Sequence, residues 1–119
     1  MKTHPEAGAN LLELRPRRNA EWETAEGGRV VLLVPKFRNR RVRSWLVPLL
    51  ARPDFRVKLD DLGTSFWRLC DGTMPISEIA ERIAVEFGAE EEALWDRIAR
   101  FVVKLEREGL LVLAAPKKI

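Results

Sequence analysis

Few residues in this chain could carry out catalysis or bind a metal. Its 119 residues include one histidine, His4, and one cysteine, Cys70. A lone imidazole and a lone thiol cannot supply the ligands of a zinc site, and a single cysteine forms no internal disulfide. Because free cysteines are usually buried, we expect Cys70 to lie in the core. The sequence therefore predicts no catalytic residue, no metal site and no cofactor.

Motifs for nucleotide binding and for metal-dependent hydrolysis are also missing. The sequence has no Gly-rich phosphate loop, no Gly-x-Gly-x-x-Gly and no His-Glu-x-x-His. Asp60, Asp61 and Asp71 are the acids nearest an apolar helical pattern. A helix cap at one end and a turn at the other account for them. We therefore expect a binding protein rather than an enzyme.

The most strongly charged segment is a basic connector over residues 36–53, which has six cations and no acid. Such a run is either a solvated loop or a dock for an acidic partner surface. If it docks a partner, the contact residues are Arg38, Arg40, Arg41, Arg43 and Trp45. A third interpretation is a structural subunit that uses Trp45 and Leu49 as an obligate interface.

The clearest periodic patterns fall in residues 55–109. Residues 55–59 alternate between apolar and basic, which predicts a strand with Arg56 and Lys58 on one face. Three amphipathic helices follow at helical spacing. Their expected boundaries are Asp60 or Asp61 to Gly72, Ser77 as the cap of the second helix to Gly88, and glutamates 90–92 to Gly109.

Upstream, residues 19–34 have the pattern of a β-hairpin. Trp22 and Thr24 alternate with glutamates, Gly27 and Gly28 form the turn, and a β-branched run ends at Pro35. These two strands can pair with residues 55–59 in a three-stranded antiparallel sheet. The sequence therefore predicts an α+β fold, with an N-terminal sheet followed by three helices.

Length and composition suit one domain with a modest core, because the chain is 46% apolar and 33% charged. We place this domain at residues 19–115, with a flexible tail over residues 1–18 and a short one over residues 116–119. No apolar run approaches the ~20 residues of a membrane span, and the first residues are polar and unlike a signal peptide. We expect a cytoplasmic protein without membrane contact.

Residues 55–113 resemble the PqqD family, the pyrroloquinoline quinone biosynthesis protein D group of peptide-binding modules. The order and spacing of several short blocks carry the resemblance. These are Leu59, Trp67-x-x-Cys70-Asp71-Gly72, Ser77-Glu78-Ile79-Ala80, Phe101 with Leu105, and Glu108-Gly109-Leu110-Leu111. The long basic connector is a departure from the family pattern.

The resemblance implies a winged-helix-like domain that recognises ribosomally made precursor peptides. It implies that the leader of the precursor binds as an added strand on the sheet edge, against the last helix. The bound leader is then presented to a modifying enzyme, often a radical S-adenosylmethionine (SAM) protein. A chain without a fused catalytic domain fits a stand-alone adaptor.

The residues themselves point to the same kind of site. The edge of a short sheet has unpaired backbone groups that an extended peptide can satisfy. The expected peptide-binding residues are Arg56, Val57, Lys58 and Leu59 on the edge and Trp95, Ala99 and Val102 on the last helix. In the alternative interpretation, Trp95 completes the core, and the two cations only protect the edge against aggregation.

A DNA-binding winged helix is the rival function, favoured by the helix order and by a pI of 9.4. A recognition helix usually presents its N-terminal residues to the DNA. Here that turn has Glu90, Glu91 and Glu92, with Asp96 close behind, and phosphates would repel them. The basic connector could still bind phosphates without sequence preference. We therefore regard nucleic acid as the less favoured partner.

Overall fold

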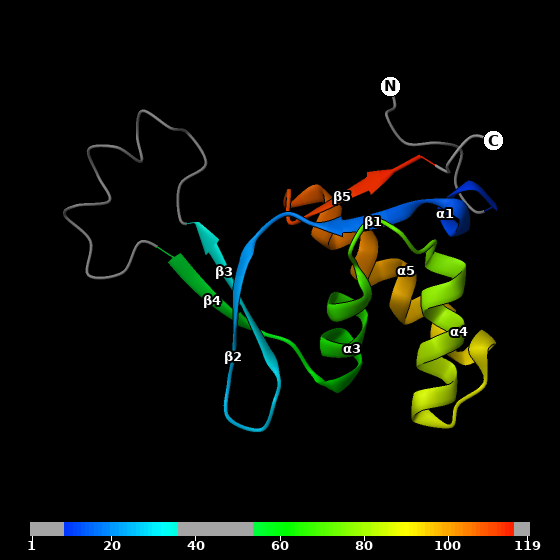
Figure 1. Cartoon of the computed structure of the whole chain (residues 1–119), viewed down its shortest axis with the longest axis horizontal. Coiled ribbons are helices and arrows are strands. Elements are labelled where there is room, and N and C mark those ends of the chain that lie inside the picture. The colour runs from blue at the N-terminus through cyan, green and yellow to red at the C-terminus, as the bar shows by residue number, and fades with distance from the viewer. Residues whose placement is uncertain (1–8, 36–53, 116–119) are drawn as a thin grey trace.

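The computed structural model describes residues 9–35 and 54–115. The fold is α+β, and the three-stranded antiparallel sheet and the three following helices confirm the expected class (Figure 1). The elements in chain order are α1 (Ala9–Glu13), β1 (Arg15–Arg18), β2 (Glu21–Thr24), β3 (Val30–Pro35), β4 (Asp54–Lys58), α3 (Asp61–Leu69), α4 (Ile76–Phe87), α5 (Glu91–Arg107) and β5 (Leu111–Ala114). None of the described helices is long and apolar enough to cross a membrane.

The larger sheet has the strand order β2-β3-β4, with both pairs antiparallel. Gly27 and Gly28 make the β2–β3 turn with φ angles of 88° and 86°, values that favour glycine. The sheet extends away from the helices and reaches them where β4 leads into α3 (Figure 1). Only one end of this sheet therefore packs against the body of the protein.

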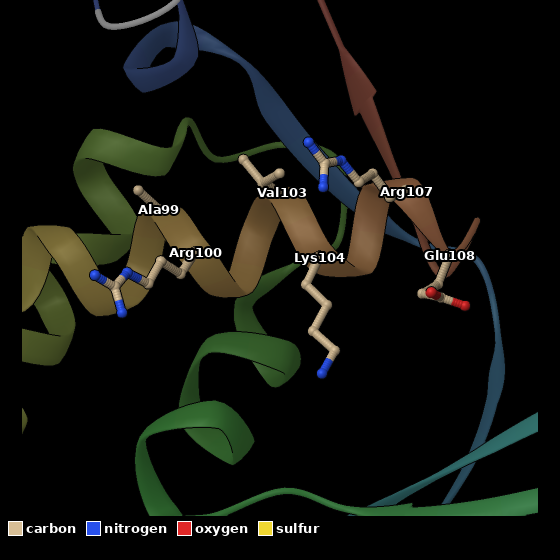
Figure 2. A pocket seen from close by; sticks show the side chains of 6 residues that line it. All are labelled: Ala99, Arg100, Val103, Lys104, Arg107 and Glu108. Atoms are coloured by element: carbon tan, nitrogen blue, oxygen red, sulfur yellow. The ribbon is translucent and has the colours of Figure 1, made fainter.

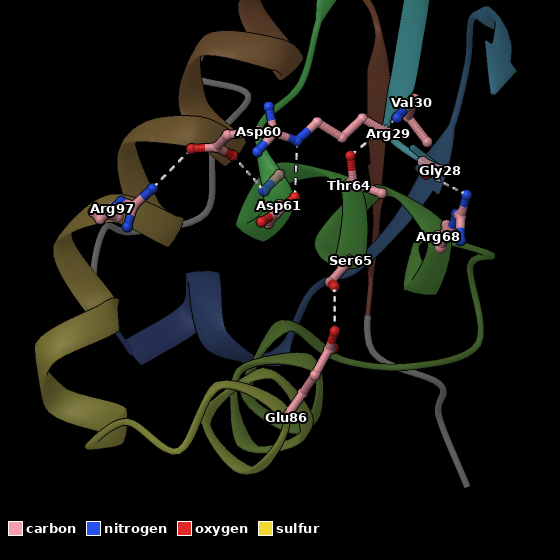
Figure 3. Close-up of polar contacts among 11 residues, drawn as sticks. Gly28, Arg29, Val30, Asp60, Asp61, Thr64, Ser65, Arg68, Glu86 and Arg97 are labelled. Carbon is pink, nitrogen blue, oxygen red and sulfur yellow. Dashed lines mark hydrogen bonds and ion pairs between the residues drawn. The ribbon is translucent and has the colours of Figure 1, made fainter. Parts of the chain in front are cut away.

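A small polar network joins the hairpin to α3 (Figure 3). Arg29 pairs with Asp61 at 2.9 Å, and Arg68 donates to the Gly28 carbonyl at 2.8 Å. The hydrogen bond from Arg29 lowers the pKa of the Asp61 carboxyl. The buried hydroxyl of Thr64 accepts a hydrogen bond from the Val30 N–H at 3.0 Å. These contacts fix the inner end of the sheet relative to α3.

The helix starts agree with the sequence in one case and differ in another. Asp60 caps α3, because its side chain accepts a hydrogen bond from the Gly63 N–H at 2.8 Å. The prediction that Ser77 caps the next helix is wrong, since α4 begins at Ile76 without a side-chain cap. The N–H of Ile76 instead donates to the Leu14 carbonyl at 2.9 Å. A distant segment thus satisfies one of the first-turn N–H groups that have no partner within the helix.

The core lies between the three helices and the inner part of the larger sheet. Its fully buried side chains include Val30, Leu32, Phe66, Trp67, Ile76, Ile79, Ile83, Ile98, Val102 and Leu111. The rings of Phe66 and Phe101 pack edge to face, with their centroids 5.6 Å apart. Cys70 is buried as expected, and burial raises the pKa of its thiol to about 12.

The tail expected over residues 1–18 does not describe residues 9–18, which form α1 and β1. β1 pairs with β5, so that Arg15 lies opposite Ala114 in a second, two-stranded sheet. Arg18 also donates to the carbonyls of Trp67 and Arg68, at 3.1 and 2.9 Å. Because the partner strand lies at the other end of the chain, no local period marked this segment.

Candidate functional site

The candidate site is the outer edge of β4, which pairs only with β3 among the described strands. The Leu59 N–H donates to the Val30 carbonyl at 2.9 Å. In an antiparallel pair the inward-bonded residues alternate, so Leu59 and Val57 face β3, and Arg56 and Lys58 direct their backbone groups outward. No described backbone partner outside the β3–β4 pair bonds to Arg56 or Lys58. This edge is open to an added strand.

The two faces of β4 differ in chemistry. Val57 and Leu59 share the face of Val30 and Leu32, which belongs to the core at its inner end. Leu59 is buried there, but Val57 is 41% exposed and Phe55 is 56% exposed. Both side chains are exposed because the sheet continues beyond the helices that could cover it. Arg56 and Lys58 lie exposed on the opposite face.

One flank of α5 lies beside the end of β4. Arg97 pairs with Asp60, two residues after Lys58, at 2.9 Å. On the same flank, the Phe101 ring would lie 3.4 Å from a Cβ placed at Gly63. Lys104 points from α5 to the side on which α3 lies (Figure 2). We call these three residues, Arg97, Phe101 and Lys104, the β4-side flank of α5.

The predicted helix residues do not lie on this flank. Residues 95 and 99 are each two positions from Arg97, which is about 200° around the helix. Trp95 packs partly buried against the core, and Val102 is fully buried within it. The structure therefore brings Arg56, Val57, Lys58 and Leu59 together, but places Trp95 and Ala99 on the other flank. Their contact with a ligand stays a prediction.

A second feature is a hollow of about 500 Å³ on the outer face of α5 (Figure 2). Its described lining is Ala99, Arg100, Val103, Lys104, Arg107 and Glu108. The cations recur at the spacing of one helix face, a signal that was present in the sequence but was not recognised there. Arg100 is also paired with Asp96 at 3.2 Å. This face combines positive charge with the exposed side chain of Val103.

The acids near α3 have structural roles. Asp60 caps the helix and Asp61 pairs with Arg29. Asp71 accepts hydrogen bonds from the hydroxyl and N–H of Thr73, and the hydroxyl contact is the main cause of the lowered pKa of Asp71. Within the described residues, no group of His, Cys, Asp and Glu side chains could hold a metal ion.

The partner contacts predicted in the basic connector lie outside the described residues. These are Arg38, Arg40, Arg41, Arg43 and Trp45.

Comparison with known proteins gives one match. The PqqD family, described as coenzyme PQQ synthesis protein D, matches residues 50–111, which are 62 of the 119 residues. No curated protein and no solved structure matches the chain. The matched segment contains β4, α3, α4 and α5, and so includes both sides of the candidate site. The chain belongs to the PqqD family, whose members are peptide-binding accessory proteins in the biosynthesis of pyrroloquinoline quinone and other ribosomally made, modified peptides.

Proposed function

We propose that this protein binds the leader of a ribosomally synthesised precursor peptide as an added strand on β4. The observation that carries the proposal is the open edge at Arg56 and Lys58, beside the β4-side flank of α5. An extended peptide would satisfy the outward N–H and C=O groups of both residues. Backbone hydrogen bonds would supply affinity, and the pockets between alternate side chains would select the sequence.

The groove would be built from parts with separate roles. Val57 would contact apolar side chains of the peptide, and buried Leu59 would hold the end of β4 in the core. Phe101 and Lys104 would cover the peptide from the helix side. The Asp60–Arg97 pair would fix the distance between strand and helix. No residue in this arrangement needs to react, so the protein would have no turnover of its own.

The bound leader would be presented to a separate modifying enzyme, which we propose is a radical SAM enzyme, as the family resemblance implies. The arginines of the connector would contribute by steering an acidic surface of that enzyme. The outer face of α5 adds the positive charge of Arg100 and Arg107, which lie next to Lys104. In this proposal the peptide binds along β4, and the enzyme contacts the connector and this outer face.

DNA binding is less well supported. The first turn of α5 contains Glu91 and Glu92, and its N-cap is Glu90. Phosphates would be repelled from the turn that a recognition helix inserts into the major groove. Specific binding to duplex DNA would therefore require a different surface.

The test is an amide NMR titration of the whole chain with leader peptides encoded by short reading frames beside its gene. Shifts should concentrate in residues 55–59 and 94–105. Lys58→Pro removes one outward N–H and should weaken binding by about tenfold or more, since a peptide carbonyl loses its donor. Lys58→Ala keeps the N–H but removes the positive charge, so it shows how much of the loss in affinity comes from the charge alone.

Thr24→Pro is the matched control. By the same alternation, Thr24 directs its N–H outward from β2, on the opposite edge of the sheet. This variant should bind the leader normally, and circular dichroism should show all three variants folded. Equal losses of leader affinity in Lys58→Pro and Thr24→Pro would overturn strand addition on β4. Amide NMR shifts that occur with DNA and not with peptide would overturn it as well.

A further inference from the structure

The two faces of β4 impose a pattern on any strand added to its edge. An added strand continues the faces of the sheet, because successive side chains point to opposite sides. Side chains on one face would lie beside Val57, on the face that it shares with Leu59. Side chains on the other face would lie beside Arg56 and Lys58. The ligand therefore meets an apolar surface at every second residue and a basic surface at the residues between.

The sheet already contains a strand of the complementary kind. β2 reads Glu21, Trp22, Glu23, Thr24. Its Trp22 lies opposite Leu32, on the face of Val57, and is 37% exposed. Its Glu23 lies on the basic face and pairs with Arg56 at 2.8 Å. An acid on this face thus finds a cation within the protein itself.

Positive charge remains available for a ligand beside this edge. Lys58 makes no ion pair with any residue of the described chain, in contrast to Arg56. Lys104 points into the space between α5 and the side of α3, also without an ion pair in the described ranges. A basic segment in the groove would face these cations at short range and be repelled. An acidic segment would be attracted.

From this geometry we infer that the accepted leader segment alternates apolar and acidic residues, with the apolar row on Val57 and the acidic row on Arg56 and Lys58. The inference rests on the proposed strand addition and names the class of peptide that the edge selects. Val57 and Lys58 are its specificity-determining residues. Alternation matters as well as composition, because a slip of one residue would place acids against Val57 and apolar side chains against Lys58.

The test uses three synthetic peptides of about nine residues, long enough for one strand. The first alternates Glu and Val, the second alternates Lys and Val, and the third has the composition of the first in two blocks. Binding to the whole chain is measured by fluorescence polarisation at low salt. The first peptide should bind about tenfold more tightly than either of the others, since each cross-strand charge pair contributes modestly.

Variants of the protein sharpen the result. Lys58→Glu should lower the affinity for the Glu–Val peptide and raise that for the Lys–Val peptide. Arg82→Glu is the matched control, because it makes the same charge change on α4, where Arg82 pairs with Glu78. Val57→Ser should lower the affinity for the Glu–Val peptide without raising that for the Lys–Val peptide. These variants change exposed side chains, and their folding can be checked by circular dichroism.

The outcomes separate this inference from the proposed function. Equal binding of all three peptides, each lost in Lys58→Pro, would overturn the alternating pattern and leave strand addition in place. Binding of a natural leader in the absence of any binding by the Glu–Val peptide would also overturn the pattern. If Lys58→Pro had no effect on any peptide, including a natural leader, strand addition itself would be wrong.

Discussion

The two sheets of this protein are both antiparallel, but they differ in how far their edges and faces are covered by the rest of the chain. In the β1–β5 sheet, the second edge of β1 is occupied, because Arg18 N–H donates to Cys70 and Gly72 N–H donates to Pro16 at 3.0 and 2.9 Å. Pro16 and Leu111 are buried there. In the β2-β3-β4 sheet, β2 is exposed along its length and the outer edge of β4 has no described strand partner. One sheet closes the fold and the other leaves an edge and a face to solvent.

This difference indicates where binding can evolve without loss of stability. A side chain in the closed sheet supports the core, so changing it changes the fold. A side chain at the outer end of the open sheet contacts few other residues, so its identity can be set by a ligand. Four predictions test this division, beginning with the largest expected effect.

Leu111→Ala in the closed sheet should lower the free energy of unfolding by about 2–5 kcal/mol, because it leaves a cavity beside the core. Val57→Ala in the open sheet should change it by less than about 0.5 kcal/mol, because Val57 is substantially exposed. Urea unfolding followed by circular dichroism measures both. Similar losses in the two variants would remove the distinction between the sheets.

Proline substitutions at neighbouring positions of β4 should differ in their cost to stability. Val57→Pro removes an N–H that faces β3 and should destabilise the protein by about 1–3 kcal/mol, since it leaves a β3 carbonyl without its donor. Lys58→Pro removes an outward N–H and should cost less. Thermal unfolding of the two variants gives the comparison. If Lys58→Pro were the more damaging, the assignment of inward and outward groups on β4 would be reversed.

Asp60→Ala should cost about 1 kcal/mol, because it removes the cap of α3. Arg97→Ala removes only the exposed ion pair with Asp60 and should cost well under that amount. Both variants should nevertheless weaken leader binding, since both release α5 from the end of β4. Arg97→Ala with full affinity would show that the pair does not position the groove.

The smallest effect is expected at the turn that covers the second edge of β1. The Thr73 hydroxyl lowers the pKa of Asp71, so the folded pKa lies below the unfolded value of about 3.9. The contribution to stability is therefore present above that value and is lost as pH falls through the folded pKa. Thr73→Ala should make unfolding slightly less sensitive to acid. Urea midpoints compared at neutral and acid pH would detect it, and an unchanged acid dependence would contradict it.

Local patterns predicted most of the elements. The Gly27–Gly28 turn, the cap at Asp60 and the helix end at Gly88 are all set by neighbours in sequence, and each is confirmed. Distant contacts account for the errors. Helix α4 begins at Ile76, one residue before the expected cap, where the Ile76 N–H bonds to the distant Leu14 carbonyl, and the β1–β5 pairing had no local period to reveal it.

The site was predicted in part for a related reason. Alternation along β4 correctly placed Arg56 and Lys58 on one face and Val57 on the other. A helical stripe, however, does not tell which of its two flanks will lie beside a given strand. That choice depends on contacts between residues far apart in sequence, among them the packing of Phe101 on Phe66 and the Asp60–Arg97 pair. The outward direction of the Lys58 N–H likewise required the register with β3.

The pairing of Arg15 with Ala114 also sets an order of events during synthesis. Strand β1 emerges from the ribosome early, but its partner β5 is almost the last described segment to be made. The hairpin and the helices have contacts closer in sequence and can form first. During that interval the nascent chain would expose the β5-facing edge of β1 as well as the outer edges of β2 and β4. Completion of β5 would cover that edge of β1 and so remove a strand-binding edge that competes with β4.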